Sequence, residues 1–90
     1  MIIRNFRKTD YPQVVDLLIS QGVEPPEHIS ELRGACFVAI KDSNIVGIIY
    51  ALTGASSKAY VDYLAVNSEH HGTRVFFELL NRLEKELIAL

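Results

Sequence analysis

The sequence predicts an α+β fold with two layers, in which an antiparallel sheet packs against helices. Three observations lead to this prediction. Consecutive β-prone segments separated by turn residues occupy the middle of the chain, and segments of helical periodicity lie on either side of them. The length of 90 residues, 49% of them apolar, suits one small domain over residues 1–90.

The N-terminal part of the chain predicts a strand followed by a helix. Residues 2–6 are β-prone, and a helix is expected over 10–20. Thr9 and Asp10 are both N-cap types, and Gln13 stands three residues after Asp10, which is the spacing of a capping box. Gly22 then provides a C-terminal stop. The apolar stripe of this helix consists of Val14, Val15, Leu17 and Leu18.

The middle of the chain predicts an antiparallel meander. Pro25 and Pro26 prevent a helix from continuing, and a short helix over 27–32 has weak support. Turn residues at 42–44 and 54–57 separate the β-prone runs, so the strands should pair in sequence order. The expected strands are 35–41, 45–53 and 58–66.

The last element is expected to be a helix that begins near 67–72 and runs to the C-terminus. Glu78 with Arg82, and Arg82 with Glu86, stand at i,i+4 spacing on its polar side. The apolar face expected to pack on the sheet consists of Phe76, Leu79, Leu80, Leu83, Leu87 and Leu90.

Composition and charge exclude several classes of function. A net charge of −2 argues against nucleic acid as a partner, because phosphate-binding domains carry a basic excess. No apolar stretch approaches the ~20 residues that cross a bilayer, and no signal-peptide pattern is present, so we expect no membrane contact and a cytoplasmic location. The single Cys36 fits a small buried apolar residue. No metal is expected, because His28, Cys36, His70 and His71 lack zinc-type spacing.

The segment from Val66 into the last helix is a candidate anion site. A strand ends there and a helix begins, so backbone N–H groups without helical partners point toward the strand end. His70, His71 and Arg74 add cationic side chains. The alternative is a solvated loop in which Glu69 balances part of this charge.

Several segments together resemble the GNAT superfamily of N-acetyltransferases. They are the opening at 3–11, the hairpin segments 37–40 and 45–47, and Asp62-Tyr63-Leu64-Ala65-Val66 followed by Glu69-His70-His71-Gly72. The resemblance covers essentially the whole chain. It implies that acetyl-coenzyme A binds at the wedge between the fourth strand and its next neighbour, and that the acetyl group passes directly to an amine.

The resemblance also implies which residues hold the cofactor. The backbone of Leu64 and Val66 would bind the pantetheine arm and the acetyl carbonyl, and the loop with His71, Gly72, Thr73 and Arg74 would hold the pyrophosphate. The family pattern there is Arg or Gln, two residues, Gly, one residue, then Gly or Ala. Arg74 and Phe76 depart from it, and their bulk would keep backbone away from phosphate. Arg74 either binds phosphate through its guanidinium or fills the groove.

Catalytic residues are less well defined. Asp62 and Glu69 are the candidates for a general base, and Tyr60 and Tyr63 for a general acid. The alternative is that these are ordinary surface carboxylates and packed tyrosines. Family members continue with further strands and a helix, whereas this sequence stops after the helix that follows the fourth strand, which would leave the edge at 58–66 open for a homodimer.

Two functions therefore remain open from the sequence. One is a minimal acetyl-coenzyme A-dependent N-acetyltransferase, in which the acidic stretch with Glu24, Glu27 and Glu31 attracts an amine of unknown identity. The other is a catalytically inert protein of the same fold that serves as a binding or assembly module.

Overall fold

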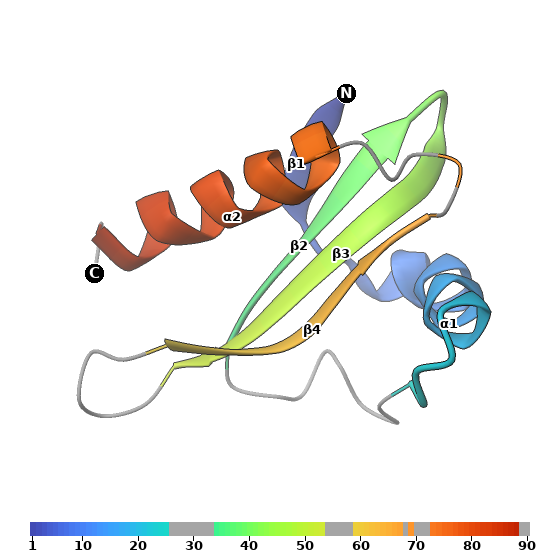
Figure 1. Ribbon diagram of the computed structural model, residues 1–90, viewed down its shortest axis with the longest axis horizontal. Helices are drawn as coiled ribbons and strands as arrows, with labels where there is room; N and C mark the ends of the chain where they lie inside the picture. Colours follow the sequence, from blue (N-terminus) through green and yellow to red (C-terminus); the bar gives the residue numbers. More distant parts are fainter. Residues whose placement is uncertain (26–33, 54–58, 68, 70–72, 89–90) are drawn as a thin grey trace.

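The computed structural model describes residues 1–25, 34–53, 59–67, 69 and 73–88 (Figure 1). The element order agrees with the sequence prediction, with a 3₁₀ turn before the first helix. In chain order the elements are β1 (Ile2–Asn5), η1 (Lys8–Asp10), α1 (Tyr11–Ser20), β2 (Gly34–Lys41), β3 (Asn44–Thr53), β4 (Ala59–Val66) and α2 (Thr73–Ile88). The helix expected over 27–32 and the turn at 54–57 lie outside the described residues.

The four strands form one antiparallel sheet in the order β1-β2-β3-β4, which confirms the predicted meander. Asp42 and Ser43 connect β2 to β3 with φ values of 52° and 66°, the two left-handed positions that a two-residue hairpin of type I′ requires. The pairing slips twice. The β2–β3 register skips Val46, and the β3–β4 register skips Asp62, so each of these residues is a β-bulge.

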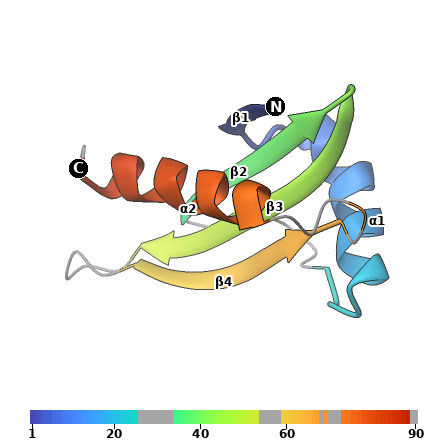
Figure 2. The same ribbon diagram turned by 45° about the horizontal axis from the view of Figure 1, so that its top comes forward.

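The helices cover opposite faces of the sheet, so the fold has three layers (Figure 2). The α+β class is confirmed, but the expected two-layer arrangement is wrong. Val38 and Ile48 belong to the core under α1, whereas their neighbours Phe37 and Ile49 belong to the core under α2. Successive residues of a strand point to opposite faces, and every residue from Ile45 to Ala51 is buried, which requires cover on both sides.

The start of α1 differs from the predicted capping box. Asp10 has helical backbone angles, φ −80° and ψ −16°, and its carboxylate makes no cap bond to α1. Instead it accepts hydrogen bonds from the Arg7 backbone N–H at 2.8 Å and from the Arg4 guanidinium at 2.7 and 2.9 Å. Gln13 Oε1 accepts the Ile45 N–H at 3.1 Å. The side chains of Asp10 and Gln13 therefore join α1 to the sheet instead of capping the helix. The guanidinium of Arg4 in β1 offers Asp10 a charged partner that the N-terminus of α1 does not.

The end of α1 is as predicted. Gly22 has a φ of 74° and donates its N–H to the Ile19 carbonyl, while Val23 donates to the Leu18 carbonyl. This pair of bonds is the Schellman motif, which needs a left-handed residue where Gly22 stands. Val23 also packs against the core under α1.

The face that α2 turns to the sheet is rotated from the expected one. Val75, Leu79 and Leu83 are buried, whereas Phe76, which was assigned to the core, is 37% exposed. Gly47 allows this close approach, because a Cβ at that position would lie 3.0 Å from Val75 Cγ1 and 3.1 Å from Leu79 Cδ1. The predicted stripe was thus correct for Leu79, Leu80 and Leu83 and wrong for Phe76, while the side chains of Leu87 and Leu90 lie outside the described residues.

Neither described helix is both long and apolar enough to cross a membrane.

Candidate functional site at the edge of β4

The outer edge of β4 is the feature that the sequence prediction singled out, and its backbone orientation follows from the register. Within the described residues, β4 pairs with β3 alone. The Asn67 N–H donates to the Val46 carbonyl at 2.8 Å, so in an antiparallel ladder the backbone groups of Ala65 point toward β3. The N–H and C=O of Leu64 and Val66 therefore point the other way, toward the outer edge. These are the residues expected to bind an amide-containing ligand through the backbone.

The bulge at Asp62 bends β4 two residues before Leu64. Bulges of this kind are common beside active sites, because they change the direction of the strand edge. Asp62 and Tyr60 were both candidate catalytic residues. Their backbone lies in β4, but their side chains lie outside the described part of the chain, so their roles stay predictions.

An apolar shoulder overhangs this edge on the α2 side. The polar flank of α2 faces β1, where Ile3 shares a small hollow with Glu78, Asn81 and Arg82. At 100° per residue, Phe76 and Leu80 lie on the opposite flank, above β4. Leu80, Leu64 and Val66 are each half-buried and pack against the core under α2. We call Phe76, Leu80, Leu64 and Val66 the β4 shoulder.

The N-terminus of α2 lies at one end of the β4 shoulder. Thr73 is its first residue, so its backbone N–H belongs to the helix-end donors that favour an anion. The side chain of Thr73, and all of His71 and Gly72, lie outside the described residues. The predicted phosphate contacts of these three residues therefore remain predictions.

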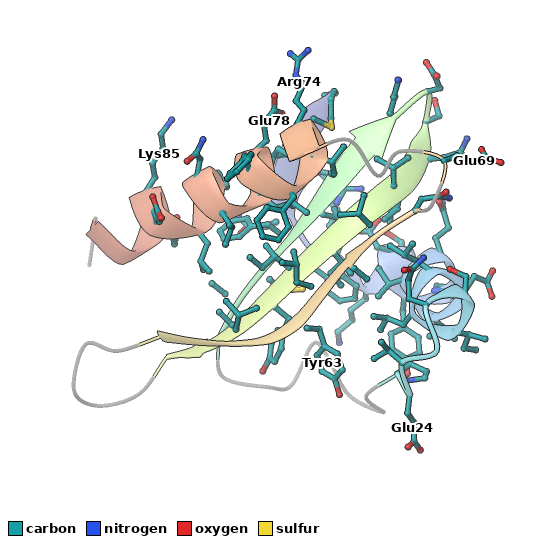
Figure 3. The ribbon with its side chains drawn as sticks, in the orientation of Figure 1. Glu24, Tyr63, Glu69, Arg74, Glu78 and Lys85 are labelled. Atoms are coloured by element: carbon teal, nitrogen blue, oxygen red, sulfur yellow. The ribbon has the colours of Figure 1, made fainter. Side chains whose placement is uncertain are left out.

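Arg74 does not point toward the β4 edge. Its Nε donates to Glu78 Oε1 at 3.1 Å, and its side chain is 84% exposed. Figure 3 shows Arg74 with Glu78 and Lys85 along the side of α2 that is turned away from β4. A phosphate contact by Arg74 would require it to leave Glu78.

The remaining candidates for acid–base chemistry lie apart. Glu69 is exposed, and its backbone N–H donates to Asn67 Oδ1 at 2.9 Å, which forms a local turn after β4. Tyr63 is half-buried on the α1 face, with its ring centroid 6.1 Å from that of Tyr50. Figure 3 shows Glu69 and Tyr63 extending to different sides of the molecule. The structure therefore does not bring them together as an acid–base pair.

Nucleophile and metal chemistry have no support in the described residues. Burial, together with the nearby carboxylate of Asp10, raises the pKa of the Cys36 thiol to about 12, so the thiol stays protonated at neutral pH. Within the described ranges, no group of three or more His, Cys, Asp or Glu side chains is arranged to hold a metal ion.

Within the described residues, the chain forms a four-stranded antiparallel meander between two helices, which is an α+β fold, and the outer edge of β4 lies next to the N-terminus of α2. The sequence pattern of the Acetyltransferase (GNAT) family matches residues 3–90. The chain therefore belongs to the GNAT acetyltransferase family. No curated protein matches the chain.

Solved structures of several acetyltransferases are similar to this chain. The chain is similar to the aminoglycoside 6'-N-acetyltransferase from Enterococcus faecium, with a TM-score of 0.81 and 23% identity over 99% of this chain and 56% of that one. An aminoglycoside 6'-N-acetyltransferase complexed with coenzyme A matches with a TM-score of 0.83, 23% identity and the same coverage. An IAA acetyltransferase from Bacillus cereus matches at 0.73 and 19% identity, over 98% of this chain and 58% of that one. The chain thus spans little more than half the length of these enzymes.

Sequence reasoning found the strand and the helix that form the edge but missed two of its features. The bulge at Asp62 has no signal in a single sequence, because it is created by the pairing of β4 with β3. The sequence does contain a signal for the position of Phe76 on the flank of α2. Leu79 and Leu83 define a helical face on which Val75 fits better than Phe76, and Phe76 then falls on the flank.

Proposed function

We propose that this chain binds acetyl-coenzyme A along the outer edge of β4 and that the protein transfers the acetyl group to an amine. The observation that supports the proposal best is the direction of the Leu64 backbone. Its N–H and C=O face the outer edge, where they match the amide groups of an extended pantetheine arm. Membership in the GNAT family and a related fold complexed with coenzyme A support the same ligand.

The residues of the edge fit the parts of this ligand. The β4 shoulder would cover the methylene and methyl groups of the pantetheine arm, and burial of apolar area there favours binding. Backbone N–H groups at the start of α2, including that of Thr73, would receive the pyrophosphate. The cofactor supplies an activated thioester, and the chain supplies orientation and charge stabilisation.

The acyl acceptor is proposed to be an amine that approaches from the α1 side. Val23 and Tyr63 pack against the core under α1, and Figure 3 shows the exposed Glu24 on the same lower side of the molecule as Tyr63. A carboxylate near an aromatic ring suits an ammonium group. Tyr63 is the tyrosine of β4 whose side chain the structure describes, and its hydroxyl is, with that of Tyr60, a candidate to protonate the departing thiolate.

Thermal unfolding with and without acetyl-coenzyme A tests the proposal. At a hundredfold excess over its Kd, a ligand adds about 2.7 kcal/mol, which raises Tm by about 10 °C or more in a domain of this size. Release of free coenzyme A in the presence of amines then separates an enzyme from an inert binding module. Absence of a Tm shift at millimolar cofactor would refute both forms of the proposal.

Arg74→Ala tests how the pyrophosphate is held. Because Arg74 is paired with Glu78 and directed away from β4, we expect affinity for acetyl-coenzyme A to fall by less than about threefold. A larger loss of affinity that becomes smaller as salt is added would instead show that Arg74 binds the phosphate, which is one of the two roles the sequence predicts for it.

We also propose that the outer edge of β4 supports a homodimer when no cofactor occupies it. Unpaired strand edges tend to pair with another strand, and Val61 on β4 is 48% exposed. Sedimentation velocity at about 50 µM should show a dimer if this pairing has micromolar affinity. A single monomeric species at that concentration would contradict the proposal.

A further inference from the structure

A cleft of about 320 Å³ lies on the α1 face, and none of its lining residues is assigned above to acetyl-coenzyme A or to the acyl acceptor. It lies between α1, the start of β3 and the end of β4. Leu17 and Ile45, 5% and 8% exposed, form its apolar floor. Its volume is within the range of small-molecule sites. The polar side chains at its rim are Gln13, Asp16, Ser20, Asn44 and Asn67.

The orientation of each rim amide is determined by a backbone partner. Gln13 Oε1 accepts the Ile45 N–H at 3.1 Å, and Asn67 Oδ1 accepts the Glu69 N–H at 2.9 Å. The amide nitrogens of Gln13 and Asn67 therefore keep their donor capacity for a ligand. Asn44 is oriented in the opposite sense, because its Nδ2 donates to the Asp42 carbonyl at 3.2 Å and its Oδ1 remains an acceptor.

The rim thus offers two kinds of groups. Gln13 and Asn67 provide N–H donors, while Asp16 provides a carboxylate and Asn44 an amide oxygen. Ser20 donates its hydroxyl to the Leu17 carbonyl at 2.6 Å, so its oxygen is a further acceptor. A matching ligand carries a cationic donor for Asp16 and a carbonyl or carboxylate oxygen for the two amides.

We propose that this cleft binds a small primary amine that also bears a carbonyl oxygen, a molecule of the size and polarity of an amino acid or its amide. The ammonium group pairs with Asp16, and the carbonyl oxygen accepts from Gln13 and Asn67. The site is connected to the turn before α2. Asn67 donates its backbone N–H to the Val46 carbonyl and accepts the Glu69 N–H through its side chain, so a bound molecule changes the environment of both amides.

Two-dimensional ¹H–¹⁵N NMR of the 90-residue chain, titrated with glycinamide, tests this proposal. We expect saturable shifts of the Ile45, Asn67 and Glu69 backbone amides and of the Gln13 side-chain amide, with a Kd of about 1–10 mM, which a ligand of this size permits. Methylammonium, which lacks the carbonyl, and N-acetylglycinamide, which lacks the charge, should each bind at least about fivefold more weakly.

Asp16→Asn should weaken glycinamide binding by about fivefold, because it removes the partner of the ammonium group. Asp16 is exposed, so the variant should keep the wild-type spectrum elsewhere. Glu84→Gln, which removes an exposed carboxylate on α2, is the matched control and should bind as the wild type does. Non-saturable shifts, equal binding of N-acetylglycinamide, or unchanged affinity in Asp16→Asn would each overturn the proposal. None of these results depends on acetyl-coenzyme A.

Discussion

Replacement of Asp10 by Asn should destabilise the fold more than any surface substitution. Asp10 is 6% exposed and accepts hydrogen bonds from both Arg4 guanidinium nitrogens and from the Arg7 backbone N–H. Removing one partner of a fully buried ion pair costs about 3–5 kcal/mol. The Arg4 side chain is 24% exposed, so water recovers part of that loss. We expect a loss of about 2–3 kcal/mol, which corresponds to a Tm lowered by about 8–24 °C.

The effect should depend on pH in a defined direction. The hydrogen bond from Arg4 holds the pKa of Asp10 below its usual value, and the Arg7 N–H adds to this. A carboxyl whose pKa is lower in the folded state contributes stability above its unfolded pKa of 3.8 and loses that contribution as pH falls through the folded pKa. The difference in free energy of unfolding between wild type and Asp10→Asn should therefore be largest at pH 7 and should become smaller as the pH falls below about 4.

Urea unfolding at pH 7 and at steps down to about pH 3 measures both effects. A double-mutant cycle with Arg4→Gln isolates the pair, and the coupling should be about 1–3 kcal/mol at pH 7. Equal stability of Asp10→Asn and wild type at pH 7 would refute the assigned role of the pair. A difference that stayed constant from pH 7 to pH 3 would show that the effect comes from packing and not from the charge.

Three further predictions follow from the packing and the site. Gly47→Val should lower the free energy of unfolding by about 1–3 kcal/mol, since even a Cβ at this position would lie 3.0 Å from a side chain of α2. Urea unfolding measures this loss, and unchanged stability would contradict the close approach of α2. Cys36 should react with a disulfide reagent at pH 8 far more slowly in the folded protein than in urea, because its pKa is raised to about 12; equal rates would show that the thiol is accessible. Phe76→Gln should weaken acetyl-coenzyme A binding by about fivefold, because apolar burial is lost. Phe77→Gln, at the neighbouring position that is 56% exposed, should leave the affinity unchanged. Calorimetric titration measures both affinities, and equal effects of the two substitutions would contradict the role of the β4 shoulder.

The candidate site was predictable where it depends on local pattern. The strand containing Leu64 and Val66 and the helix that follows it were recognised from periodicity and from the turn residues between them. The role of Arg74 was not predictable in this way. The pair of Arg74 with Glu78 follows from their i,i+4 spacing, but the packing of α2 on the sheet decides that this side of the helix is turned away from β4.

The sequence by itself determined the element order, the hairpin at Asp42–Ser43 and the stop of α1 at Gly22, because each depends on backbone preferences of neighbouring residues. Tertiary structure alone decided the placement of the helices on opposite faces of the sheet and the pairing of Asp10 with Arg4. It also decided the bulge at Asp62. These features depend on contacts between residues far apart in the chain or in different elements, where burial and charge outweigh local propensity. The candidate edge of β4 depends on both: the residues predict the strand, but the register with β3 decides to which side the N–H and C=O of Leu64 point.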